Sequence, residues 1–141
     1  MAVVAEIGTA HGGSLHKARE LIRAAADAGA DYVKFQWVYA REILHPKTGG
    51  VPLPGGTVPL YERFRRLEVP PDFFAALRDY ARERGCGFIC SPFGLQSLAE
   101  LLAIEPDAVK IASPELNHYP LLEALSRHNA GLAAAGKPPV P

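Results

Sequence analysis

The stretch GFICSPFGLQSLAELLAIEPDAVKIAS, residues 87–113, decides the fold class. Its first seven residues are a short apolar run that predicts a strand, and LQSLAELLAI, residues 95–104, has the apolar spacing of an amphipathic helix. DAVKIAS, residues 107–113, predicts a second strand. A strand, a helix and a strand in this order indicate two parallel strands joined by a right-handed crossover.

The rest of the chain repeats this unit. Earlier strands are predicted at residues 2–7 and 30–38, and further helices at 15–29, 70–85 and 119–128. The order is therefore a strand followed by a helix, four times over. This alternation indicates an α/β protein with a parallel sheet, either doubly wound or part of an eight-stranded barrel.

The turn after the first predicted strand helps to separate these two folds. GTAHGG, residues 8–13, contains glycines but not in the GxGxxG register of a dinucleotide-binding sheet. We therefore favour a TIM-type (β/α)8 barrel, which takes about 250 residues when complete. Residues 1–141 would then be the N-terminal half of the barrel domain, cut before or within a fifth strand that KPPVP, residues 137–141, could open.

Residues 41–60 interrupt the repeat. They contain PKTGGVPLPGGTVP, whose prolines and glycines predict a long loop without regular structure. A loop of this length in a compact domain is usually functional or mobile.

Composition narrows the class of partner. Fifteen Lys and Arg balance fifteen Asp and Glu, so nucleic acid and anionic membranes are disfavoured and small molecules are favoured. No apolar run approaches the length of a membrane span, and MAVVAEIG lacks the basic start of a signal peptide, which predicts a cytoplasmic protein. Cys86 and Cys90 fit no zinc or disulfide pattern and are expected to be buried.

Two lysines interrupt predicted apolar strands, Lys34 in ADYVKFQ and Lys110 in DAVKIAS. A buried ammonium group is costly unless it is paired, so their recurrence predicts an anionic ligand. In barrels the active site lies at the C-terminal ends of the strands. The polar residues expected there are Glu6, His11, Lys34, Gln36, Ser91, Lys110, Ser113 and Glu115.

Two ammonium groups and two hydroxyls that converge at the C-terminal ends of the strands would bind a phosphate or a phosphorylated carboxylate. Glu6 would be the structural counter-ion of Lys34 or Lys110, a functional residue, or both, and His11 is either a loop hydrogen-bonding residue or a substrate contact. Arg63, Arg65 and Arg66 are interpreted as a solvated helix face rather than an anion site.

These residues resemble the sialic acid synthases, a family that includes N-acetylneuraminate, legionaminate and pseudaminate synthases. Five stretches match in the family's order: AEIGTAHGGSLHKARELI (5–22), AAADAGADYVKFQ (24–36), PLYERFRRLEVP (59–70), FICSPFGLQSLAEL (88–101) and VKIASPELNHYPLL (109–122). The resemblance implies a transferase of carbohydrate biosynthesis, which condenses phosphoenolpyruvate with an N-acetylmannosamine-type sugar to give a nonulosonic acid and phosphate.

The resemblance also implies roles for individual residues. Lys34, Lys110, Ser91 and Ser113 match residues that hold phosphoenolpyruvate, and Glu115 matches the acid/base group, so Glu115 and Lys110 are the catalytic candidates. Glu6, Gln36, His11 and Asn117 match substrate-binding positions.

The full-length family uses Mn²⁺ or Mg²⁺, with histidine ligands beyond residue 141, and is expected to form a homodimer. We therefore expect no metal ligands within this chain.

One departure from the family bears on catalysis. Pro114 stands where the family has glycine, and proline fixes φ and removes an N–H immediately before Glu115. We therefore expect the aim of Glu115 to differ from that in the family.

Two other functions stay open. A truncated or degenerate barrel would bind an anion or a partner chain without catalysis, and the 141 residues alone are expected to be inactive. Alternatively, Lys110 would form a Schiff base as an aldolase nucleophile, since apolar surroundings favour the neutral amine of a lysine.

Overall fold

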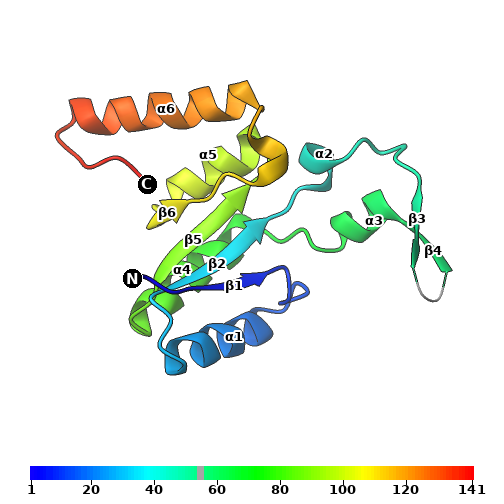
Figure 1. Ribbon diagram of the computed structural model, residues 1–141, viewed down its shortest axis with the longest axis horizontal. Helices are drawn as coiled ribbons and strands as arrows, with labels where there is room; N and C mark the ends of the chain where they lie inside the picture. The colour runs from blue at the N-terminus through cyan, green and yellow to red at the C-terminus, as the bar shows by residue number, and fades with distance from the viewer. Residues whose placement is uncertain (54–55) are drawn as a thin grey trace.

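The structure, a computed structural model, describes residues 1–53 and 56–141. Its main sheet contains β1 (Val4–Gly8), β2 (Tyr32–Trp37), β5 (Gly87–Pro92) and β6 (Ala108–Val109), in this spatial order and all parallel (Figure 1). The predicted strands and their parallel arrangement are confirmed. The fourth strand, however, is limited to two residues, where residues 107–113 had been predicted.

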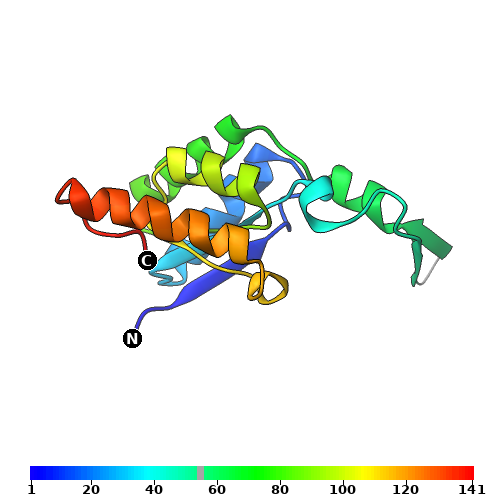
Figure 2. The ribbon, with the colours of Figure 1, turned by 90° about the horizontal axis from the view of Figure 1, so that it is seen from above.

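The helices α1 (Leu15–Asp27), α4 (Pro71–Glu83), α5 (Leu95–Ala103) and α6 (Tyr119–Ala134) pack against one another in chain order. They line one side of the sheet, and no described element covers the other side (Figures 1 and 2). This open face carries the candidate site.

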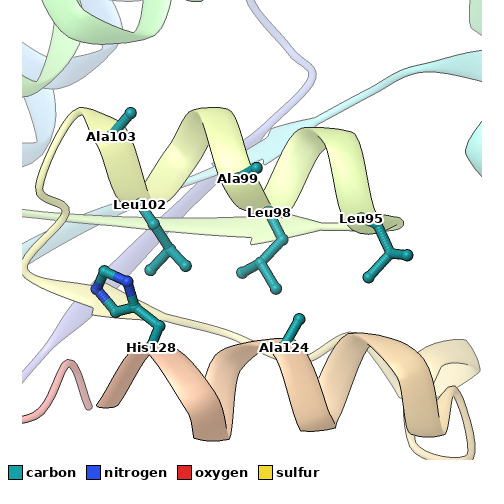
Figure 3. A pocket seen from close by; sticks show the side chains of 7 residues that line it. All are labelled: Leu95, Leu98, Ala99, Leu102, Ala103, Ala124 and His128. Atoms are coloured by element: carbon teal, nitrogen blue, oxygen red, sulfur yellow. The ribbon is translucent and has the colours of Figure 1, made fainter. Parts of the chain in front are cut away.

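The final helix extends further than its sequence pattern indicated. We predicted 119–128, whereas α6 continues to Ala134 and ends before Gly136, which has a positive φ of 70°. α6 runs beside α5, and between them lies a hollow of about 430 Å³ (Figure 3). Leu95, Leu98 and Leu102 point into it from α5, so it belongs to the helix layer and not to the strand ends.

The last residues lie along the outer edge of β6. The side-chain amide of Asn129 donates to the carbonyl of Val140 at 3.0 Å and accepts from its N–H at 2.9 Å. The N–H of Val109 donates to the carbonyl of Pro141 at 2.8 Å. KPPVP is not a strand in the structure, but its end occupies the edge where a fifth strand would pair.

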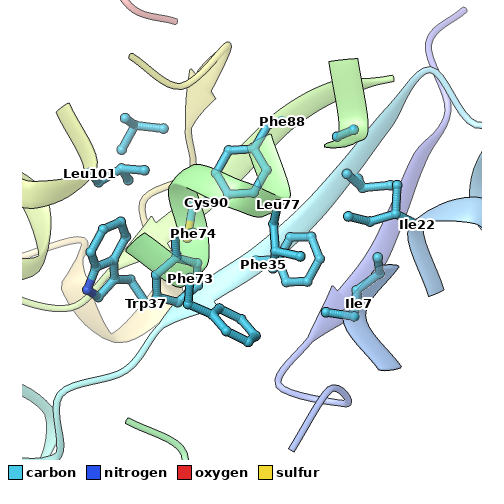
Figure 4. Packing of buried hydrophobic residues seen from close by; sticks show 14 of the residues in the cluster. Ile7, Ile22, Phe35, Trp37, Phe73, Phe74, Leu77, Phe88, Cys90 and Leu101 are labelled. Atoms are coloured by element: carbon cyan, nitrogen blue, oxygen red, sulfur yellow. The ribbon is translucent and has the colours of Figure 1, made fainter. Parts of the chain in front are cut away.

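The hydrophobic core lies between the sheet and the helices. Alternation along β2 turns Val33, Phe35 and Trp37 towards the helices, where all three are fully buried. The rings of Phe35 and Phe88 stack at 5.6 Å between centroids, and Trp37 stacks on Phe74 of α4 at 4.2 Å (Figure 4). This packing holds the central strands in fixed positions.

Cys86 and Cys90 are buried free thiols, as predicted. Burial raises the pKa of the Cys90 thiol well above its usual range. The thiol therefore stays protonated and acts as a small apolar group.

The prediction that residues 41–60 lack regular structure is wrong for most of the segment. The chain forms α2 (Ala40–Ile43), an antiparallel hairpin of β3 (Gly50–Leu53) and β4 (Gly56–Pro59), and then α3 (Leu60–Arg65). Residues 54–55 lie outside the described residues. Proline is compatible with such a ribbon, because half of the N–H groups of a two-stranded hairpin point outward and bond to nothing in the ladder.

We call this segment, residues 40–65, the arm, because it extends away from the sheet (Figure 1). Its base is fixed to α5 by Glu42, whose carboxylate accepts from the N–H of Gln96 at 2.8 Å and of Ser97 at 3.2 Å. A Cβ at residue 94 would lie 2.4 Å from the Glu42 carboxyl carbon, so a side chain at this position would displace the Glu42 carboxylate from its contact with α5.

Candidate functional site

The open face of the sheet brings together polar residues from three neighbouring strands. The register pairs Glu6 of β1 with Lys34 of β2, and Gln36 of β2 with Ser91 of β5. Residues in register share a face, and Lys34 and Gln36 are two apart, so all four side chains lie on the side opposite the helices.

Lys34 is the buried cation of this face. Its side chain is only 10% exposed, and its Nζ lies 2.7 Å from Oε2 of Glu6, whose side chain is 57% exposed. The pair is therefore asymmetric: the lysine is held among its neighbours, whereas the carboxylate reaches into open space. An anionic ligand could replace Glu6 as the partner of Lys34 without moving a strand.

Ser91 supplies an unused hydroxyl on the neighbouring strand β5, in register with Gln36. The residue is 1% exposed, and its Oγ has no hydrogen-bond partner among the described residues. Buried hydroxyls are normally satisfied, so an unpaired one at a strand end indicates a ligand-binding position.

The structure places Lys110 differently from Lys34. Its N–H donates to the carbonyl of Cys90 at 3.0 Å, which continues the β5–β6 ladder and puts Lys110 level with Ser91. The residue is exposed, however, so the prediction that Lys110 lies in a buried strand is wrong. The reason is that β6 ends the sheet, and no strand packs beyond it in the described chain.

Exposure also weakens the Schiff-base interpretation. Lys110 is exposed to solvent, whereas this interpretation requires a lysine in a desolvated, apolar site.

Ser113 and Glu115 lie in a 3₁₀ helix, η1 (Ser113–Glu115), directly after β6. Pro114 occupies the first turn of this helix, where a missing N–H breaks no hydrogen bond. The Glu115 N–H still donates to the carbonyl of Ala112 at 2.9 Å. The backbone therefore accepts Pro114 without losing the turn that carries Glu115.

Glu115 has a partner that the sequence analysis missed. Its side chain is 12% exposed, and Oε2 lies 2.7 Å from Nδ1 of His118, three residues later. The i,i+3 spacing of a carboxylate and an imidazole could have indicated this pair. Asn117 and Ser113, by contrast, are exposed at the surface.

His11 does not join the open face. Its ring lies 5.0 Å from Phe73 and 6.0 Å from Phe35, both on the helix side of the sheet. Nδ1 accepts from the N–H of Gly13 at 3.0 Å, which leaves the proton of the neutral ring on Nε2. Burial, and secondarily the charge of Lys17, lowers the pKa of His11. These contacts match the loop hydrogen-bonding alternative.

A hollow of about 420 Å³ lies beside these residues, between the strand ends and the arm; we call it the strand-end hollow. Gln36 lines it from β2 and Thr9 from the turn after β1, and Leu60, Arg63 and Phe64 line it from α3. Arg63 had been assigned to a solvated helix face. Although it is exposed, it borders this hollow, a placement that the sequence pattern did not indicate.

The described residues offer no set of metal ligands. Within residues 1–53 and 56–141, no group of three or more His, Cys, Asp and Glu side chains converges on a point. A complete ligand set for the divalent metal implied by the resemblance is therefore not found among these residues. In the same residues, no helix has the length and apolar character needed to cross a bilayer.

Comparison with known proteins shows which family the chain belongs to. The model of the NeuB family matches residues 21–135. The chain is 37% identical to the spore coat polysaccharide biosynthesis protein SpsE of Bacillus subtilis, over 90% of this chain and 34% of that protein. It is 31% identical to the N,N'-diacetyllegionaminic acid synthase of Campylobacter jejuni, over 90% of this chain and 39% of that protein.

The chain is also similar in structure to a solved relative. The N-acetylneuraminic acid synthetase of Leptospira borgpetersenii, crystallised in complex with citrate, superposes with a TM-score of 0.75 and 29% identity. The match covers 86% of this chain and 39% of that one. The chain thus spans a little over a third of the length of the relatives it matches.

Proposed function

Because this chain belongs to the NeuB family, we propose that it forms the first four βα units of a (β/α)8 barrel enzyme. The enzyme would condense phosphoenolpyruvate with an N-acetylmannosamine-type sugar to give a nonulosonic acid and phosphate. Relatives named as synthases of legionaminic acid and N-acetylneuraminic acid support this assignment.

The observation that carries the proposal is the combination of Lys34 and Ser91. A nearly buried ammonium and a buried hydroxyl without a partner lie on neighbouring strands of one open face. Phosphoenolpyruvate is a small trianion or dianion with acceptor oxygens at both ends, and such a ligand satisfies both groups. Lys110, level with Ser91, would neutralise the second anionic end.

The remaining residues divide the chemistry between binding and proton transfer. Gln36 and Glu6 border the space beside Lys34 and would hold the sugar hydroxyls. In the reaction, C3 of phosphoenolpyruvate forms a bond with the aldehyde carbon of the sugar, whose oxygen takes up a proton and becomes a hydroxyl. Water adds at C2 and loses its protons, and the bond from C2 to the phosphate oxygen breaks, which leaves a C2 ketone and releases phosphate. Glu115 would take the proton of that water, and its contact with His118 would fix the orientation of its carboxylate.

Calorimetric titration of the 141-residue chain with phosphoenolpyruvate tests the binding part. We expect saturable binding at a 1:1 ratio, which inorganic phosphate and pyruvate reproduce only weakly. Heats no larger than those of dilution into buffer would contradict the proposed binding of phosphoenolpyruvate.

The catalytic part needs a polypeptide that continues through the rest of the family's length. We expect that protein to release phosphate from phosphoenolpyruvate in the presence of N-acetylmannosamine, and the Lys110→Ala variant to lose this activity. Full activity in Lys110→Ala would exclude the assigned role of Lys110.

A second candidate is anion binding without turnover, because the nearly buried Lys34 ammonium and the unpaired Ser91 hydroxyl account for binding and not by themselves for proton transfer. Binding of phosphoenolpyruvate with no phosphate release in the longer polypeptide supports this candidate. Phosphate release in that polypeptide supports the synthase.

A further inference from the structure

The strand-end hollow combines an apolar wall with a small set of polar groups. Val38, Ile43 and Phe93 line its wall, and Gln36 is the polar group closest to the candidate anion site along the sheet. Across from them α3 contributes Arg63, the charged residue of the lining. An apolar hollow with few polar groups is the usual form of a small-molecule site.

The charge of Arg63 is not balanced by the carboxylates of the neighbouring elements. Glu62 pairs with Arg65 at 3.7 Å, and Glu68 accepts from the Ala40 N–H at 2.8 Å. Glu42 caps the first turn of α5. Within the described chain these acidic groups are occupied elsewhere, and Arg63 forms no ion pair. A planar guanidinium in this position matches the geometry of phosphate and carboxylate oxygens.

We infer that Arg63 binds an anionic substituent, a phosphate or a carboxylate, carried by the acceptor sugar. The inference rests on the proposed function and specifies its acceptor. The two anionic ends of phosphoenolpyruvate are assigned to Lys34 and Lys110 on the sheet. Arg63 instead lines the same hollow as Gln36, the residue assigned above to the sugar, so the anion at α3 belongs to the second substrate.

The test compares two probes that differ only in charge, N-acetylmannosamine and N-acetylmannosamine 6-phosphate. Each is titrated into the ¹⁵N-labelled 141-residue chain with phosphoenolpyruvate present, and affinities are taken from amide shifts. We expect the phosphorylated sugar to bind about tenfold to a hundredfold more tightly, the range of a charge-assisted hydrogen bond. Equal affinities, or no binding of the phosphorylated sugar at millimolar concentration, would overturn the inference.

Variants locate the effect. Arg63→Ala should remove the preference for the phosphorylated sugar, and Arg63→Lys should retain part of it. Arg65→Ala is the matched control: it removes an arginine two residues away that pairs with Glu62 instead of lining the hollow. A preference that survives Arg63→Ala, or that Arg65→Ala also removes, contradicts the inference.

The same variants distinguish the source of the anion. Arg63→Ala should leave the affinity for phosphoenolpyruvate alone unchanged, within about twofold. If phosphoenolpyruvate binding falls instead, Arg63 binds that substrate and the inference fails while the proposed function stands. If wild-type chain does not bind phosphoenolpyruvate at all, the proposed function fails separately.

Discussion

The two lysines of the candidate site belong to the same parallel sheet but lie in different surroundings. Lys34 on β2 is flanked by strands on both sides and is fixed by Glu6 at 2.7 Å. Lys110 follows the two-residue β6 at the end of the sheet and is exposed. The position of a residue along a parallel strand thus predicts at which level of the sheet its side chain lies. The neighbouring strands determine whether that side chain is buried and held in one orientation.

The largest expected effect is a difference in folding stability between a substitution in the packed core under β2 and one beside η1. Phe35→Ala removes a fully buried ring that stacks on Phe88 and should lower the free energy of unfolding by about 3–5 kcal/mol. Leu116→Ala, beside η1 and 69% exposed, should change it by less than about 0.5 kcal/mol. Urea denaturation measures both. Equal losses would contradict the contrast between a packed and an open region.

The next effect concerns the lysines themselves. Lys34→Ala should weaken phosphoenolpyruvate binding about tenfold to a hundredfold, because it removes a preorganised, charge-assisted contact. Lys110→Ala should weaken it less, because an exposed lysine is hydrated and mobile before the ligand arrives. Calorimetry on both variants measures the ratio. A greater loss in Lys110→Ala would reverse our ordering of the two sites.

A smaller effect tests the assignment of His11 to the core. Since burial lowers its pKa, the native chain resists protonation while the unfolded chain accepts it below the ordinary value near 6.5. The stability contributed by neutral His11 is present above that pH and is lost as pH falls, by at most about 1.4 kcal/mol per pH unit.

His11→Phe should therefore flatten the fall in urea midpoint between pH 7.5 and 5.5. An unchanged slope in this variant would show that His11 titrates normally and is not held neutral by the core.

The smallest effect concerns Pro114. Because it fits the first turn of η1, Pro114→Gly should lower the free energy of unfolding by only about 0.4–1 kcal/mol, through a more flexible unfolded chain. Thermal unfolding measures this change. A gain in stability would show that proline strains the turn before Glu115.

The sequence predicted the parts of the fold that depend on periodicity. The parallel order of strands, the helix α4 with proline in its first turn, and the burial of Cys90 all follow from local pattern. The hairpin in residues 50–59 was missed, since proline and glycine content does not show which N–H groups a two-stranded ribbon leaves unused.

The candidate site was predictable where strand alternation defines it. Lys34, Gln36 and Ser91 share a face because of their register. The exposure of Lys110 was not predictable, because it depends on β6 being the last strand of the described sheet. The position of Arg63 depends on how the arm docks through Glu42, a contact between residues more than fifty positions apart.

The most direct test of the central claim is a crystal structure of the 141-residue chain soaked with phosphoenolpyruvate. We predict an anionic group of the ligand within hydrogen-bond distance of both Lys34 Nζ and Ser91 Oγ, with the Lys34–Glu6 contact lengthened beyond its present 2.7 Å. Ligand bound elsewhere, with Ser91 Oγ still unpaired and the Lys34–Glu6 pair intact, would contradict the account.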